Sequence, residues 1–204
     1  MMTNRGDRIR AVIAGFISGL LFIFPLSKFG VVLQWWGGLL FAIGMGAGGA
    51  LGVTVFGALR RRTLYEFGKF ATIGVLNTSI DLVILNILIA TSGIADGLHY
   101  SVWKALAFAT ATVNSYFWNK WWAFDNTEPV ATKEFGKFFG FSLMGAFLNV
   151  GTATVIVNFV SHPEAFTPAM WGSIAALIAV VASKLWNFFF YRTFVFRRPE
   201  GEII

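Results

Sequence analysis

Charged side chains inside predicted membrane spans are the first candidates for chemistry, because charge is costly there and is usually kept for function. Asp81 is the only carboxylate in any segment that we predict to span a membrane. It lies about 18 Å along a helix from Lys69, near mid-membrane. We expect Asp81 to be neutral, paired or exposed to water. Three roles are consistent with this position. Asp81 could pair with a lysine whose protonation depends on the bound substrate, it could carry a coupling proton, or it could be a structural residue held by backbone or hydroxyl groups.

Two lysines also fall inside predicted spans. Lys184 lies seven residues before Tyr191, and Asn187 follows it at the next turn. The lysine is thus roughly 10 Å from the cytoplasmic end of its segment. A cation beside an amide at that depth suits a lipid phosphate, unless the lysine extends its ammonium to the interface. Lys104 lies only four residues into its segment, so phosphate binding and extension to the interface explain it equally well.

Three amides near the cytoplasmic face are candidates for a polar lining. Asn77 and Asn114 come from different predicted helices at similar depths, so they either hydrogen-bond each other or bind sugar hydroxyls. Asn119 lies one turn beyond Asn114 and joins the same predicted lining.

Cations and aromatic residues follow at the cytoplasmic interface itself. Lys120 and Arg192 could collect an anionic headgroup. Trp118, Trp122 and Phe124 form either an aromatic belt or a stacking surface for a sugar. The alternation of aromatic residues here predicts short extended segments.

The elements that position these residues are membrane helices. Of the 204 residues, 56% are hydrophobic and only 13% are charged. A soluble chain of this size cannot bury so much apolar surface. Apolar runs between charges and turn residues predict six spans, at about residues 11–26, 31–59, 70–90, 100–118, 138–160 and 169–191. The predicted fold class is an all-α polytopic membrane protein.

Basic residues predict the orientation. With the N-terminus inside, 13 of the 16 Lys and Arg residues fall on the cytoplasmic side, the side on which positive residues accumulate. We expect a multi-pass protein of the cytoplasmic (inner) membrane with both termini in the cytoplasm. Arginines before the first apolar run also resemble the start of a signal peptide, but no A-x-A cleavage site follows. We therefore interpret this run as a retained anchor helix.

Glycine distinguishes the first part of the chain. Gly44, Gly48 and Gly52 share one helix face because they are spaced by four, and this lets a second backbone approach closely. The pattern predicts either a tightly packed hairpin or a homo-oligomer, unless the segment is simply rich in glycine. The capping-box spacing of Thr63 and Glu66 predicts a new helix just beyond an arginine cluster. The predicted divisions are a Gly-rich two-helix hairpin over 1–62, a four-helix domain over 63–198 and a tail over 199–204.

The four-helix domain contains an internal repeat. The sequence from Glu66 to Phe70 recurs 68 residues later, and the pattern from Phe117 to Phe124 recurs 72 residues later. Repeat 1 covers about residues 64–124 and repeat 2 about 134–196. Each repeat holds two spans, so both copies enter the membrane in the same sense. We predict a parallel relation about an axis along the membrane normal, with a site between the halves.

Two motifs carry a family resemblance. Phe70-x-x-x-Gly74-x-x-Asn77-Thr78-x-x-Asp81, followed by Asn114-x-Tyr116-x-x-Asn119-Lys120-x-Trp122-x-Phe124, resembles the GtrA-like family of small four-span membrane proteins. The resemblance covers about residues 64–198. It implies a role in moving polyprenyl-phosphate-linked monosaccharides across the cytoplasmic membrane for cell-surface glycan synthesis. The family's usual Arg is Lys120 here, and its usual Thr before the last Phe is Ala123.

Other functions fit the residues less well. The chain has no cysteine, and its two histidines lack metal-ligand spacing. Paired catalytic carboxylates and a Gly-rich phosphate loop are missing too, so we predict no enzyme, no metal and no cofactor. The net charge of +6 follows from topology, and no motif suggests nucleic acid as a partner.

Two alternatives to a flippase stay open. One is a proton-coupled exporter of organic cations that uses Asp81, although the two intramembrane lysines would repel its substrate. The other is a non-transporting membrane partner of a glycosyltransferase, which the glycine ladder would suit. In the flippase interpretation, membrane lipids surround the protein. The site for phosphate is then formed by Lys184, Asn187, Lys120 and Arg192.

Overall fold

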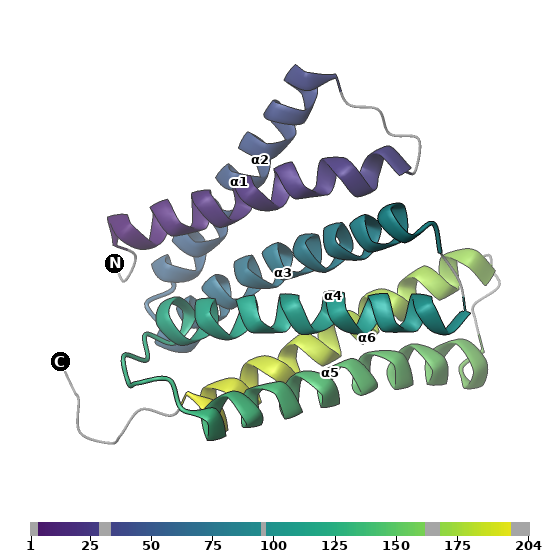
Figure 1. Ribbon diagram of the computed structural model, residues 1–204. Coiled ribbons are helices and arrows are strands. Elements are labelled where there is room, and N and C mark those ends of the chain that lie inside the picture. Colours follow the sequence, from purple (N-terminus) through teal and green to yellow (C-terminus); the bar gives the residue numbers. More distant parts are fainter. Residues whose placement is uncertain (1–3, 29–33, 95–96, 162–167, 197–204) are drawn as a thin grey trace. The chain divides into compact units, whose positions relative to one another are not determined.

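A computed structural model of the chain describes residues 4–28, 34–94, 97–161 and 168–196 (Figure 1). Every regular element in these ranges is helical, which confirms the predicted all-α fold. The predicted tail, 199–204, lies outside the described residues. The elements are α1 (Arg5–Lys28), α2 (Trp35–Ala58), α3 (Arg62–Ser92), α4 (Gly97–Trp118), η1 (Asn119–Ala123), α5 (Thr132–Phe159), α6 (Pro168–Phe190) and η2 (Tyr191–Val195).

Three helices of the described chain are long and apolar enough to cross a membrane, at Trp36–Ala58, Arg62–Ser92 and Thr132–Ile156. Their large apolar side chains are widely exposed, as bilayer-facing residues are: Leu40 is 60% exposed and Leu51 65%. The 31-residue α3 is about 47 Å long, whereas the hydrocarbon core measures about 30 Å. Helix α3 is therefore long enough to extend beyond the hydrocarbon core. The six-span topology with both termini inside stays a prediction.

The helices form two compact units, residues 1–127 and 128–204. The first unit contains α1 to α4 with η1, and the second contains α5 and α6 with η2. In the first unit, both α1 and α2 pack against α3. The predicted boundary near residue 62 is therefore not where the compact units divide. The Gly-rich hairpin shares a core with repeat 1, and repeat 2 forms a unit by itself.

Small residues hold α1 against α2, but they are not the predicted ladder. A Cβ atom on Gly15 would collide with the backbone carbonyl of Met45, and one on Gly19 with the Cα of Ala42. A Cβ on Gly44, Gly48 or Gly52 would meet nothing within 4 Å. The ladder instead lines an open hollow of about 300 Å³ beside α3. The hairpin contact uses the other small-residue face of α2, and the homo-oligomer stays a prediction.

The start of α3 is near the predicted position, but its stabilisation differs. The helix begins at Arg62, inside the arginine cluster, and its N-cap makes no side-chain hydrogen bond. Glu66 accepts a hydrogen bond from Arg62 at 2.8 Å instead of closing a capping box with Thr63. A charge pair one turn apart therefore replaces the predicted cap.

The two repeats end in the same local structure. The π-helical turns η1 and η2 begin 72 residues apart, which is the offset of the sequence repeat. Each π-turn continues the preceding helix and packs against the first helix of its own repeat, α3 or α5. The prediction of extended segments here is wrong. A two-residue alternation this short does not separate a strand from a wide helical turn that closes with i→i+5 bonds.

Candidate functional site

Polar side chains recur along one face of α3. Lys69, Asn77 and Asp81 are spaced by eight and four residues, so they lie at three levels of the helix within a sector of about 120°. Each of them bonds to a group on α4 or η1. We name this line of contacts the α3–α4 seam.

At the end of the seam farthest from Lys69, Asp81 and Lys104 form an ion pair. The Nζ atom of Lys104 donates to Oδ2 of Asp81, and the two side chains are 43% and 19% exposed. Helix α4 begins at Gly97, earlier than predicted, so Lys104 lies about 10 Å into the helix and within reach of Asp81. The other carboxylate oxygen, Oδ1, is buried without a hydrogen-bond partner among the described residues. Asp81 thus matches the expected lysine-paired carboxylate, with one oxygen left for a proton or a donor.

The middle level is an amide pair. Asn114 Nδ2 donates to Asn77 Oδ1 at 2.7 Å. Of the two predicted roles, mutual hydrogen bonding and binding of sugar hydroxyls, the structure shows the first. Asn119 is fully buried, and its Nδ2 bonds to the carbonyl and hydroxyl of Ser115 at 2.8 and 3.1 Å. Its Oδ1 has no partner within the described residues. The Asn77–Asn114 pair joins α3 to α4, and Asn119 Oδ1 is a buried acceptor that is left for a ligand.

The third level, which we name the Asp7 cluster, centres on one carboxylate that no sequence pattern singled out. Asp7, in the first turn of α1, accepts hydrogen bonds from the Tyr65 hydroxyl and, at 2.8 Å, from the Trp122 indole. It also lies 3.3 Å from the ammonium of Lys69. Asp7 and Lys69 are 3% and 1% exposed. The only sequence signal was an acid among N-terminal arginines, on the same predicted side of the membrane as Lys69.

Residues around η1 are more buried than an interfacial belt would be. Trp122 and Phe124 lie in the core, and Trp118 packs edge-on against Trp122. The outward-facing aromatic residue of this segment is Trp121. The π-turn points Trp122 inward, where its indole N–H donates to the Asp7 carboxylate. The prediction of an interfacial aromatic belt therefore does not describe Trp122 and Phe124.

Lys120 is also fully buried. Its ammonium donates to Asn126 Oδ1 at 3.1 Å, and its backbone carbonyl accepts from the backbone N–H of Asn126 at 2.7 Å. These bonds fix the chain where it leaves η1. Arg192 occupies the equivalent position of repeat 2 and is exposed. The two predicted headgroup cations therefore differ in environment, and neither is shown to bind one.

The second unit contains the remaining predicted phosphate residues on α6. Lys184 is half-buried and has no hydrogen-bond or ion-pair partner in the part of the chain that the structure describes. One turn on, Asn187 presses against Gly145 of α5, where a Cβ atom would collide with its Oδ1. That oxygen and the indole nitrogen of Trp186 are buried without partners among the described residues. Nearby, Asn149 donates to Ser183 at 3.5 Å, so α5 and α6 share polar contacts here.

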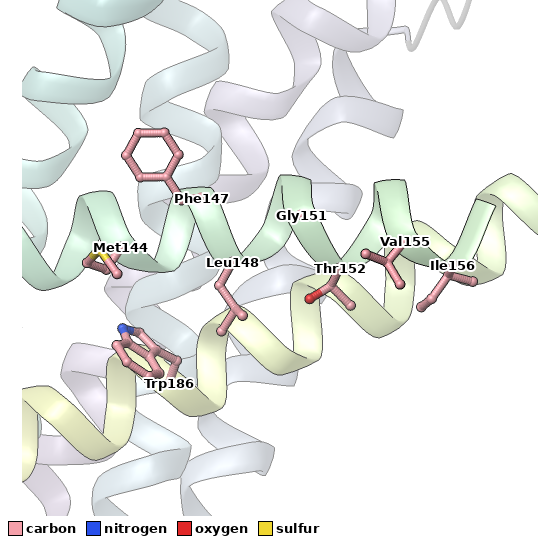
Figure 2. A pocket seen from close by; sticks show the side chains of 8 residues that line it. All are labelled: Met144, Phe147, Leu148, Gly151, Thr152, Val155, Ile156 and Trp186. Atoms are coloured by element: carbon pink, nitrogen blue, oxygen red, sulfur yellow. The ribbon is translucent and has the colours of Figure 1, made fainter. Parts of the chain in front are cut away.

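An apolar hollow of about 630 Å³ lies along α5 and α6 in the same unit. Figure 2 shows Trp186 rising from α6 below Met144 and Leu148 of α5, with Thr152 further along the helix. Lys184 does not line the hollow, because it lies about 200° around α6 from Trp186. The hollow suits hydrocarbon, and the cation lies on another side of the helix.

The described residues contain no group of three or more His, Asp or Glu that could hold a metal ion. The structure divides the predicted site residues between the two units. The second unit contains Lys184, Asn187 and Arg192. The first unit contains the other predicted polar residues: Asn77, Asp81, Lys104, Asn114, Asn119 and Lys120.

Comparisons with known proteins place these observations in a family. A search of curated proteins and a search of solved structures found no match to the chain. The family model described as "GtrA/DPMS, transmembrane domain" matches residues 69–196. The match begins at Lys69 and ends at the residue after η2, so it covers both repeats and leaves out the Gly-rich hairpin. The chain is therefore a membrane protein that belongs to the GtrA/DPMS transmembrane-domain family.

Proposed function

We propose that the protein moves a polyprenyl-phosphate-linked monosaccharide across the cytoplasmic membrane, for the synthesis of cell-surface glycans. Such a substrate needs a cation for its phosphate, polar groups for one sugar and contact with lipid for its long tail. The family to which the chain belongs connects it with processes that use lipid-linked sugars. The proposal requires no metal and no cofactor, and it treats the protein as a transporter and not as an enzyme.

One observation carries the proposal: Lys184 is a membrane lysine without a protein partner among the described residues. A half-buried ammonium in a membrane helix is costly unless an anion neutralises it. Lys104 and Lys69, by contrast, are paired with carboxylates. A phosphate is the anion that a lipid-linked sugar would bring to Lys184. The unpaired Oδ1 of Asn187, one turn away, is an acceptor for a sugar hydroxyl.

The ion pair in the first unit argues against the exporter of organic cations. A cation-binding acid must offer its charge to the substrate, but Lys104 already neutralises Asp81. An incoming cation would have to displace an ammonium that is bound within the same unit. No contact among the described residues favours the third alternative, a partner for a glycosyltransferase.

The test is transfer of a polyprenyl-phosphate-linked sugar in proteoliposomes. Lys184→Gln removes the charge and keeps the approximate length of the side chain, so we expect at least about a tenfold loss of transfer. Lys184→Arg should retain part of the activity, because the charge survives while the geometry changes. Lys133→Gln is the matched control, since Lys133 is an exposed lysine of the same unit. Normal transfer by a folded Lys184→Gln protein would refute the phosphate assignment.

A further inference from the structure

The Asp7 cluster has the composition of an anion-binding site that is already occupied. Three different donors converge on one carboxylate: the hydroxyl of Tyr65, the indole N–H of Trp122 and the ammonium of Lys69. The guanidinium of Arg10 lies at the rim, 3.6 Å from the same carboxylate. Convergent O–H, N–H and ammonium donors are the groups that also bind phosphate oxygens.

The donors and the occupant come from different parts of the chain. Lys69 and Trp122 lie inside the family match over residues 69–196, and Tyr65 is one turn before it. Asp7 lies outside the match, on the hairpin helix α1. Repeat 2 retains the equivalent lysine, Lys137, which is exposed and has no ion-pair partner among the described residues. The cationic position is thus a feature of both repeats, whereas its carboxylate is added by the hairpin.

Other contacts show that Lys69 can keep its place when Asp7 leaves. Its ammonium donates to the Trp122 carbonyl at 3.1 Å and lies 3.7 Å from Asp125, whose side chain is half exposed. It also lies 4.5 Å from the centre of the Tyr65 ring. The carbonyl and the ring would hold the lysine while an anion takes the place of the Asp7 carboxylate. Asp125 is exposed enough to turn toward water as that anion arrives.

We propose that Tyr65, Lys69 and Trp122 form a binding site for a phosphate ester, and that Asp7 occupies this site as a displaceable ligand from the same chain. The inference rests on the proposed function, in which a lipid phosphate reaches the protein. The hairpin then acts as a gate: the phosphate binds when the first turn of α1 moves away. The apparent affinity for phosphate is reduced by the fraction of time that Asp7 fills the site.

The test measures binding of two probes to the full-length protein. The first probe is inorganic phosphate added to protein in detergent. The second is a polyprenyl monophosphate in phosphatidylcholine nanodiscs, with the uncharged polyprenol as its blank. Asp7→Asn keeps the shape of the occupant but removes its charge and one acceptor oxygen. We expect it to tighten binding by about tenfold or more.

Two further variants separate the proposed site from a general charge effect. Asp7→Asn/Lys69→Gln replaces the ion pair by two amides, so it should fold and should lose the gain in affinity. Asp125→Asn also removes a carboxylate near Lys69, but that carboxylate does not accept from Tyr65 or Trp122. We expect it to change binding by less than about threefold.

An independent measurement uses the native cluster, in case Asp7→Asn does not fold. The chain has no cysteine, so Arg8→Cys introduces a single label site on the exposed side of the first turn of α1. An environment-sensitive fluorophore at this position should respond to polyprenyl phosphate and not to polyprenol. A response to inorganic phosphate as well would mean that the site accepts phosphate from water, and a response to the lipid alone would assign it to a headgroup.

Two results would overturn the inference: unchanged affinity for both probes in folded Asp7→Asn, or a label at position 8 that responds to neither probe. The proposed function fails separately, because Lys184 lies in the other unit. Normal sugar transfer by Lys184→Gln, with Asp7-dependent phosphate binding intact, would reject Lys184 as the phosphate cation and leave the gate. No sugar transfer by the wild-type protein, with Asp7-dependent phosphate binding intact, would reject the transport assignment and leave the gate.

Discussion

The Asp81–Lys104 pair predicts that its two single substitutions have unequal costs. Lys104→Gln leaves a carboxylate that is 19% exposed and already has one buried oxygen without a partner among the described residues. Losing its charged donor as well should lower the free energy of unfolding by about 2–3 kcal/mol. Asp81→Asn leaves an ammonium that is 43% exposed and can turn toward water or a headgroup. Its cost should be about 1 kcal/mol.

The double variant Asp81→Asn/Lys104→Gln measures the interaction itself. It contains two neutral amides and no orphaned charge, so it should be more stable than the sum of the single effects by about 1–2 kcal/mol. Unfolding in mixed micelles with increasing SDS, followed by circular dichroism, gives the three free energies. The reasoning is refuted if Asp81→Asn costs as much as Lys104→Gln, or if the coupling free energy is near zero.

Two further predictions concern helix contacts, with the same unfolding measurement. Gly19→Leu should destabilise the protein by about 3 kcal/mol or more, because its side chain would meet the backbone of Ala42, whereas Gly48→Leu, on the open face of α2, should cost less than about 0.5 kcal/mol. Equal effects would contradict the observed hairpin contact. Asn114→Leu should cost about 1–2 kcal/mol, since it removes the 2.7 Å bond to Asn77 and leaves that amide oxygen unpaired. Full stability would show that the amide pair holds nothing together.

Features that follow from local sequence were predictable. Apolar runs bounded by charges predicted six helices, and the described chain has six α-helices, with ends mostly within a few residues of the predicted spans. The exceptions are the N-terminal ends of α1, α3 and α5, which begin six to eight residues before the predicted spans, because polar first turns carry no apolar signal. The Asn77–Asn114 bond was predictable as well, since equal depth on neighbouring helices leaves few other partners.

Features that depend on which faces meet were not predictable in the same way. Helix α2 has small residues on two faces, so spacing alone could not show that Ala42, and not the Gly44 ladder, contacts α1. Asp7 is separated from Lys69 by 62 positions and surrounded by arginines, so its charge looked like part of a solvated end. Only the packing of α1 on α3 brings the two side chains together.

The lysines of the described chain provide the last prediction, because a structural lysine and a ligand-binding lysine should respond oppositely to loss of charge. Lys104 is satisfied by Asp81, so Lys104→Gln should reduce stability in the absence of any substrate. Lys184 has no partner among the described residues, so Lys184→Gln should leave the free energy of unfolding within about 0.5 kcal/mol or raise it. Adding a polyprenyl phosphate should then stabilise wild-type protein more than Lys184→Gln, since a ligand stabilises only the folded state that binds it and the proposed Lys69 site is present in both proteins. The comparison requires neither a known sugar nor a transport assay. If Lys184→Gln destabilises the lipid-free protein as much as Lys104→Gln does, Lys184 has a structural partner and its role as the phosphate cation is wrong.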